Sequence, residues 1–256
     1  MATTTPLETQ VKLGKLPAVT DERTLALARY LDPATLPLPP VTLDLAGAVR
    51  DWPMYGNDRI GDCTCAAAAH MIEAWTGASR GQPVEVTEHA VVTAFDRVKM
   101  LDPLTGQEGA RGLDVLKFWR TTGIGGHRIG AFVRVPLRDH VLARTGAWLF
   151  GGLYVGLQLP LTVQRQEVWD WTHRLDGPAR PGSWGGHAVD VVGYDADTLT
   201  VVTWGRLKQM TWSFWDHYGD EAYCVLSRDF LARGVAPNGF DLAALERDLA
   251  LVTGEA

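Results

Sequence analysis

The sequence predicts an α+β protein whose helices and strands form two lobes. After a proline-rich start, helical periodicity dominates the first half of the 256-residue chain, and strand-like runs follow in the second half. Helices that precede a series of antiparallel-looking strands are typical of α+β proteins. A hydrophobic content of 46% with 21% charged residues is that of a globular protein with a substantial core. A cleft between two such lobes is a usual place for an active site.

Residues 1–50 are predicted to form an extended N-terminal arm. The segment is rich in proline, and one short helix is expected over residues 21–30. The run from Leu36 to Pro40 is predicted to be extended, because proline fixes its own φ and keeps the preceding residue out of the helical region. The arm is either a packed extension of the domain or a segment that covers its cleft.

Residues 51–256 are predicted to form one domain, whose helical part spans about 51–127. Three helices are expected there, over residues 62–76, 87–100 and 112–122. Asp62 is placed as the cap of the first helix and Gly77 as its stop signal. The glycine-rich turn after the third helix lacks the preceding strand and the following Lys-Ser/Thr of a phosphate-binding loop.

The β-rich part is predicted to span about residues 128–230. Period-two alternation and short apolar runs predict strands over residues 128–135, 153–159, 188–194, 199–204, 209–215 and 221–227. A short helix is expected at 139–145, and an amphipathic C-terminal helix at about 241–251.

The bulk properties exclude several classes of function. A net charge of −6 provides no basic excess for nucleic acids or for anionic membrane surfaces. The longest apolar runs are interrupted by glycines and are too short to cross a bilayer, and the first residues do not resemble a signal peptide. Three cysteines, two of them only two positions apart, form a poor disulfide framework. We therefore expect a cytoplasmic protein.

Cys63 and His187 are the candidate catalytic pair. Cys63 opens an alanine-rich helix, where unpaired backbone N–H groups and the helix dipole stabilise a thiolate and a developing oxyanion. His187 lies at the head of an apolar strand, in the run Gly186-His-Ala-Val, and an imidazole can move the thiol proton. Asn57, six residues before Cys63, is positioned to supply a second oxyanion donor.

Other interpretations of these residues are weaker. Cys65 points about 200° away from Cys63 on the same helix, so it is predicted to be a packing residue rather than the nucleophile. A metal site made of Cys63, Cys65 and His70 fits no usual zinc spacing, and His70 is expected to pack or to lie on the helix surface. Cys224 is predicted to lie in the core, and Asp190 to be buried with a hydrogen bond or to face a neighbouring strand.

These motifs resemble those of papain-like cysteine peptidases, and of divergent bacterial or phage-type members in particular. In that family an amide side chain precedes the nucleophilic cysteine by six residues, and a Gly-His-Ala-Val strand supplies the base, as Asn57, Cys63 and His187 do here. The position of the family's orienting asparagine falls on Val202 or Thr203, and Trp204 follows as a shield for the imidazole.

The resemblance implies a papain-like fold of two lobes, in which a central Cys-bearing helix packs against a lobe built from an antiparallel sheet or barrel. It implies a thiol hydrolase that acts on a peptide or protein substrate without a cofactor or a metal. Two alternatives remain: a papain-fold binding or structural protein that has lost catalysis, and an acyltransferase or deamidase that uses the same Cys/His pair. The first alternative is a protein that kept the architecture and lost the usual orienting asparagine.

Overall fold

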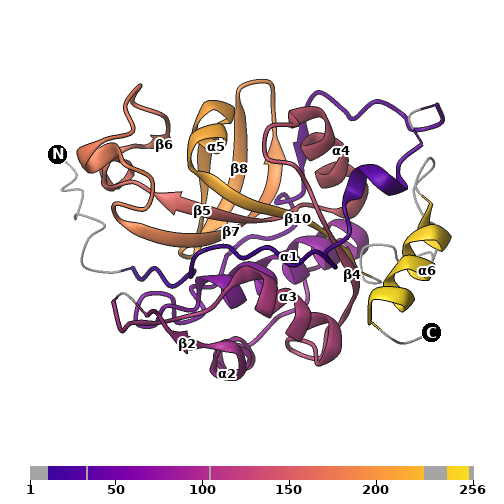
Figure 1. Cartoon of the computed structure of the whole chain (residues 1–256), viewed down its shortest axis with the longest axis horizontal. Helices are drawn as coiled ribbons and strands as arrows, with labels where there is room; N and C mark the ends of the chain where they lie inside the picture. Colours follow the sequence, from indigo (N-terminus) through magenta and orange to yellow (C-terminus); the bar gives the residue numbers. More distant parts are fainter. Residues whose placement is uncertain (1–10, 33, 104, 228–240, 254–256) are drawn as a thin grey trace.

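The computed structural model describes residues 11–32, 34–103, 105–227 and 241–253, and the architecture below refers to these ranges. Helices α1 (Cys63–Arg80), α2 (Glu88–Val98) and α3 (Gly112–Thr121) form one lobe. A large sheet with α4 (His140–Phe150) and α5 (Trp212–Tyr218) forms the other (Figure 1). The α+β class and the two-lobe arrangement predicted from the sequence are confirmed. Residues 1–10 of the predicted arm and residues 228–230 of the predicted β-rich part lie outside the described ranges.

The large sheet places its strands in the order β4-β10-β5-β7-β8-β9-β6. Their bounds are Ile129–Arg134 for β4, Leu153–Leu159 for β5, Val168–Trp169 for β6, Gly185–Tyr194 for β7, Thr198–Thr203 for β8, Arg206–Thr211 for β9 and Gly219–Ser227 for β10. Neighbouring strands in this order are antiparallel, except for β6 and β9, which are parallel. The short strand β1 (Leu43–Asp44) pairs with the C-terminal end of β7. A separate pair joins β2 (Met100–Leu101) to β3 (Glu108–Gly109).

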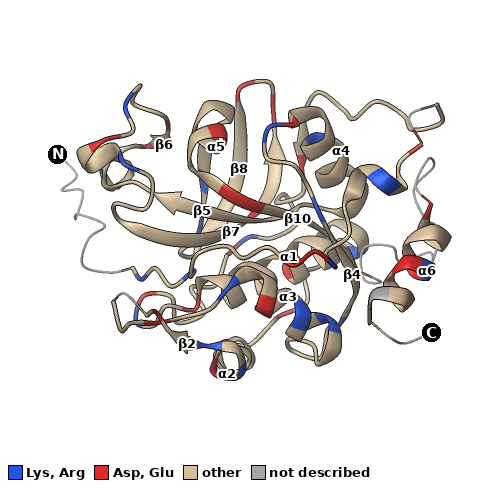
Figure 2. Cartoon of the chain, viewed as in Figure 1, with Lys and Arg blue, Asp and Glu red and all other residues tan. Residues whose placement is uncertain are grey.

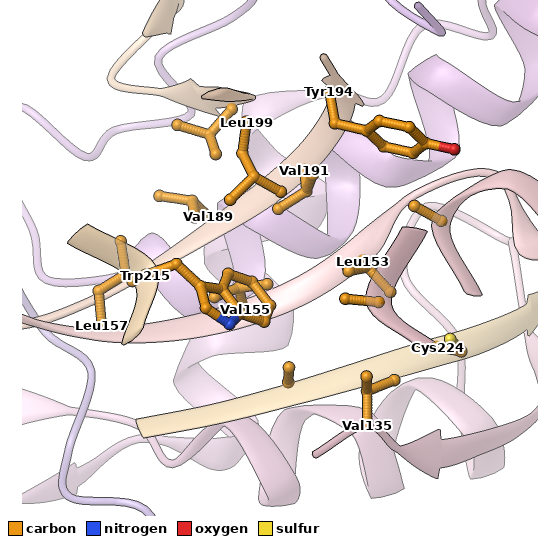
Figure 3. Packing of buried hydrophobic residues seen from close by; sticks show 14 of the residues in the cluster. Val135, Leu153, Val155, Leu157, Val189, Val191, Tyr194, Leu199, Trp215 and Cys224 are labelled. Atoms are coloured by element: carbon orange, nitrogen blue, oxygen red, sulfur yellow. The ribbon is translucent and has the colours of Figure 1, made fainter. Parts of the chain in front are cut away.

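The sheet is apolar on both faces because both are covered. Along β5, Leu153, Val155 and Leu157 point into a core shared with α4 and α5 (Figure 3). Tyr154, on the opposite face, belongs to the core of the helical lobe, and its hydroxyl donates to the Thr64 carbonyl in α1 at 3.0 Å. The alternation of β5 therefore fixes α1 against the sheet, and with it the position of Cys63.

The predicted end of the first helix is wrong. The first helix continues past Gly77 to Arg80, and Gly81, with φ of 74°, ends it instead. Gly77 lies inside the helix, where a Cβ atom would come within 3.2 Å of the Ala48 Cβ, so this glycine permits close packing of the arm rather than a stop. Asp62 precedes the helix as predicted, but its side chain makes no capping hydrogen bond.

The prediction of a strand over residues 209–215 is also wrong in its second half. The strand β9 ends at Thr211, whose side chain accepts a hydrogen bond from the Phe214 amide at 2.9 Å and starts α5. In place of the helix expected over 21–30, Leu27–Tyr30 form a helical turn of the 3-10 type. The helix expected at 139–145 extends to Phe150.

The C-terminal helix α6 (Leu242–Thr253) lies beside the helical turn of the arm, where the Tyr30 hydroxyl bonds Asp248 at 3.0 Å. Within the described ranges, no helix combines the length and the apolar character that a membrane span requires.

Candidate active site

A small cavity between the two lobes brings the predicted site residues together. Its volume is about 10 Å³, which is room for about one water molecule. Cys63 reaches it from the first turn of α1, and His187 from the start of β7. The remaining lining residues are Met54, Asn57, Ala66, Ala67, His70, Ala188, Val202, Thr203 and Trp204. Cys63 and His187 are each only 1% exposed, so the cavity is closed to solvent.

The His187 ring is held on two sides. Its Nε2 atom lies 2.7 Å from the Thr203 hydroxyl oxygen, and the Trp204 ring stacks on it with centroids 4.3 Å apart at 22°. Of the two positions left open by the sequence, Thr203 is therefore the one whose side chain is within hydrogen-bonding distance of the imidazole. The Nδ1 atom has no hydrogen-bond partner among the described residues. The thiol and the imidazole thus share the cavity without a hydrogen bond between them.

Asn57 also lines the cavity, but one of its donors is already used. Its Nδ2 atom donates to the Ile60 carbonyl at 3.1 Å, which stabilises the tight turn before α1. A side-chain amide carries two N–H groups, and a hydrogen bond from the Asn57 side chain also lowers the pKa of the Asp62 carboxyl.

Burial keeps the pair uncharged in this closed state. It raises the pKa of the Cys63 thiol to about 11, against the smaller lowering effects of hydrogen bonds from the Ala188 and Gly14 backbones. Burial also lowers the pKa of His187 to about 3. Both shifts arise because a charged side chain loses its hydration when it is buried. The arrangement is therefore a neutral thiol beside a neutral imidazole.

The N-terminal arm covers the cavity. The sequence alone did not decide between this role and that of a packed extension. Residues 12–16 run between the helical lobe and the sheet (Figure 1). The amide of Lys12 donates to the Asn57 carbonyl at 2.8 Å, and that of Lys15 to the Gly186 carbonyl at 3.2 Å. Gly14 lies so close to Gly61 that a Cβ atom at residue 14 would overlap the Gly61 carbonyl. The segment therefore covers the thiol with its main chain.

Residue Ala110 holds the other side of the same segment. Its amide donates to the Gly14 carbonyl at 2.8 Å, and its carbonyl accepts from the Leu16 amide at 3.0 Å. Lys15 and Ala110 form a parallel bridge. These contacts were missed from the sequence because they join backbone atoms, and the only signal was a glycine between two lysines in an otherwise proline-rich arm.

The other candidates have structural roles. Cys65 and Cys224 are fully buried in the core and do not line the cavity. His70 does line it, with Nε2 at 2.8 Å from the Pro53 carbonyl, and burial lowers its pKa to about 4. Asp190 is buried, but neither carboxyl oxygen has a hydrogen-bond partner within the described part of the chain, in contrast to one of the two expectations.

No arrangement of three or more His, Cys, Asp or Glu side chains suited to a metal ion occurs in the described ranges. The site is therefore built from one thiol, two imidazoles, an amide and a hydroxyl. Of these, the Cys63 thiol and the His187 imidazole are the groups whose chemistry suits a nucleophile and a base.

Comparison with known proteins identifies the fold. No protein-family model matches the sequence, and no curated protein matches it. Among solved structures, the cysteine protease xylellain from Xylella fastidiosa is 15% identical, with a TM-score of 0.63 over 86% of this chain and 97% of that one. Digestive procathepsin L 3 of Tenebrio molitor is 13% identical, with a TM-score of 0.54 over 85% and 75%.

A third structure, the Carica candamarcensis cysteine protease CMS1MS2 in complex with E-64, is 16% identical, with a TM-score of 0.53 over 73% of this chain and 99% of that one. At these identities the similarity establishes the fold. The chain has the papain-like cysteine protease fold that the sequence motifs predict.

Proposed function

We propose that the protein is a thiol hydrolase that cleaves peptide or amide bonds through a covalent acyl-enzyme. The observation that carries this proposal is the shared cavity of Cys63 and His187, which come from the start of a helix and the start of a strand. The papain-like fold supports it, because the proteins with similar structures are cysteine proteases. The three free cysteines support a reducing compartment, the cytoplasm.

In the proposed reaction the Cys63 thiol gives its proton to His187 Nδ1, and the sulfur attacks the carbonyl carbon of the substrate. The imidazolium then protonates the leaving amine, and a thioester remains on Cys63. Water, deprotonated by the same imidazole, attacks the thioester and releases a carboxylic acid and the free thiol. For Nδ1 to accept a proton, Nε2 must carry hydrogen and donate it to Thr203, which fits the 2.7 Å contact.

The negative oxygen of the tetrahedral intermediate needs donors that are already in place. The backbone amide of Cys63 lies at the N-terminus of α1, where amide groups and the helix dipole favour negative charge. We assign the second donor to the N–H of Asn57 that does not bond Ile60.

Catalysis requires that residues 12–16 leave the cleft. In the closed state the segment occupies the space above Cys63, and burial holds the thiol and the imidazole in their neutral forms. Displacement admits water and substrate, and it removes the desolvation that raises the thiol pKa.

Gly14→Val tests the proposal in the full chain. A side chain at residue 14 overlaps the Gly61 carbonyl, so the substitution displaces the segment and leaves the cavity residues unchanged. We expect at least a tenfold faster reaction of Cys63 with iodoacetamide, measured by peptide mapping, together with cleavage of a quenched peptide library. Gly130→Val, on the exposed side of β4 where a Cβ would be 3.7 Å from its nearest neighbour, is the matched control.

Three results decide the outcome. Selective labelling of Cys63 that His187→Ala slows, with peptide cleavage that Cys63→Ala abolishes, supports the hydrolase. Selective labelling of Cys63 with cleavage of esters or of amides other than peptides, and without peptide cleavage, assigns the protein to the acyltransferase or deamidase class. Equal, slow labelling of all three cysteines in a folded Gly14→Val protein overturns the proposal and favours a binding protein.

A further inference from the structure

Lys15 is buried in a pocket that is built for its charge. Its side chain is 0% exposed, and its ammonium lies 2.7 Å from an Asp220 carboxylate oxygen and 3.1 Å from a Glu221 carboxylate oxygen. The Leu16 carbonyl accepts a further hydrogen bond at 3.2 Å. A lysine is seldom fully buried unless its charge is paired, so two carboxylates and a carbonyl around one ammonium form a specific site.

Residues other than Lys15 also hold the two carboxylates in place. Its carboxylates lie at the start of β10 (Figure 2), where Gln158 Nε2 donates to Asp220 at 2.6 Å and the Tyr223 hydroxyl to Glu221 at 3.1 Å. Gly156, on the neighbouring strand β5, forms the floor, since a Cβ there would overlap the Lys15 Cε atom. Two adjacent strands of one sheet thus fix the position of the two carboxylates relative to the space above Gly156 that the Lys15 side chain fills.

The pocket is one residue away from the thiol. The Gly14 backbone lies near enough to the Cys63 thiol to lower its pKa, and the next amide, that of Lys15, donates to the Gly186 carbonyl beside His187. The main chain of residues 12–16 therefore lies where an extended peptide must lie to reach Cys63. In a peptide bound along the same path, the residue that takes the place of Lys15, next to the one over the sulfur, would direct its side chain toward Asp220 and Glu221.

We propose that this acidic pocket, defined by Gly156, Gln158, Asp220, Glu221 and Tyr223, selects substrates that carry a lysine within two residues of the cleaved bond. The inference rests on the proposed function. Main-chain hydrogen bonds to residues such as Gly186 accept any sequence, whereas the pocket discriminates between side chains. An apolar side chain would leave two partly buried carboxylates without a cation, and breaking a buried ion pair in this way is strongly unfavourable. In the closed protein, Lys15 occupies the substrate's place.

The test uses the full chain with Gly14→Val and Lys15→Ala, which displaces the arm and vacates the pocket. Two pairs of peptidyl acyloxymethyl ketones carry lysine or norleucine at the first or second residue from the reactive carbonyl. Norleucine matches the lysine stem and lacks the ammonium. We expect Cys63 to react at least tenfold faster with the lysine compound of one pair. Adding Asp220→Asn and Glu221→Gln should reduce that lysine-to-norleucine ratio to within about twofold of one.

A binding measurement separates the pocket from the reaction. The same proteins with Cys63→Ala are titrated with fluorescent Leu-Gly-Lys-Leu and Leu-Gly-norleucine-Leu peptides, and anisotropy is recorded, while circular dichroism verifies folding. A lysine preference that requires the two carboxylates supports the pocket even where no ketone reacts, and in that case only the hydrolase proposal is overturned. Reaction or binding without a lysine preference overturns the pocket and leaves the hydrolase intact.

Discussion

At the scale of single residues, the site depends on how His187 is oriented. An asparagine amide would hold the ring with a planar donor and acceptor, whereas Thr203 offers one rotatable hydroxyl, and the Trp204 ring restricts the tilt. Trp204 itself has a φ of 46°, an uncommon value for a bulky residue. The turn after β8 therefore accepts backbone strain in order to place the indole on the imidazole.

Thr203→Val should weaken both the site and the fold. Valine keeps the shape of threonine and removes the hydroxyl, so a buried imidazole nitrogen loses its partner at a cost of about 1–3 kcal/mol. In the Gly14→Val background we expect alkylation of Cys63 to slow about tenfold, because the ring tautomer is no longer fixed. Urea unfolding and iodoacetamide kinetics measure the two effects, with Thr203→Ser as the control that retains the hydroxyl. Equal kinetics for valine and serine would exclude an orienting role.

Asp62 should make the fold less stable as the pH rises. Burial raises its pKa from 3.8 to about 8, against the smaller lowering effects of hydrogen bonds from its own backbone and from the Asn57 side chain. The folded protein keeps this proton where the unfolded chain releases it, so stability is complete below about pH 4 and declines up to about pH 8. We expect Asp62→Asn to raise the melting temperature more at pH 8 than at pH 5. Exposed Asp51→Asn serves as the control, and a pH-independent difference would contradict the assignment.

At the scale of elements, sequence patterns predicted what local side chains determine. The strand β5 and the helix α2 follow from period-two alternation and from helical periodicity. The end of β9 was missed because Trp212, Phe214 and Trp215 have strand propensity, while the hydrogen bond from the Phe214 amide to Thr211 starts a helix. The continuation of α1 past Gly77 was missed because the glycine serves close packing against Ala48 of the arm, a residue distant in sequence.

Gly146→Ala should destabilise α4 although alanine favours helices. A Cβ atom at this position would overlap the Cys224 sulfur in β10 and come within 3.2 Å of Leu27 in the arm. We expect a loss of about 1–3 kcal/mol in the free energy of unfolding, which exceeds the gain in helix propensity of about 1 kcal/mol. In urea unfolding, adding Cys224→Ala should recover part of the loss. Additive effects of the two substitutions would show that the overlap is not the cause.

At the scale of the whole molecule, residues 12–16 join the two lobes. Their partners Asn57 and Ala110 belong to the helical lobe and Gly186 to the sheet. The meeting of Cys63 and His187 in one cavity was predictable because both residues stand in recognisable local motifs. Which residues of the arm cover the cavity was not predictable, because hydrogen bonds between backbone atoms leave no trace in side-chain composition.

Exposure of Cys63 should precede global unfolding. Release of residues 12–16 uncovers little surface, so the labelling rate of Cys63 should depend weakly on urea. Cys65 and Cys224 are fully buried in the cores and should react only when the fold is lost. Mass spectrometry of iodoacetamide adducts along a urea series measures the three slopes. A common slope for all three cysteines would mean that the segment opens only with the rest of the protein.

The lysine that fills the acidic pocket belongs to the same polypeptide as the pocket. A tethered group acts at a high effective concentration, in the millimolar range for short flexible connections, and dilution does not reduce it. A soluble peptide therefore competes with an occupant that is always present, and its apparent dissociation constant is the intrinsic one divided by the open fraction. Compound screens on the unaltered chain should consequently rank ligands by their ability to displace Lys15. Potency should rise in parallel for all of them when Gly14→Val raises the open fraction.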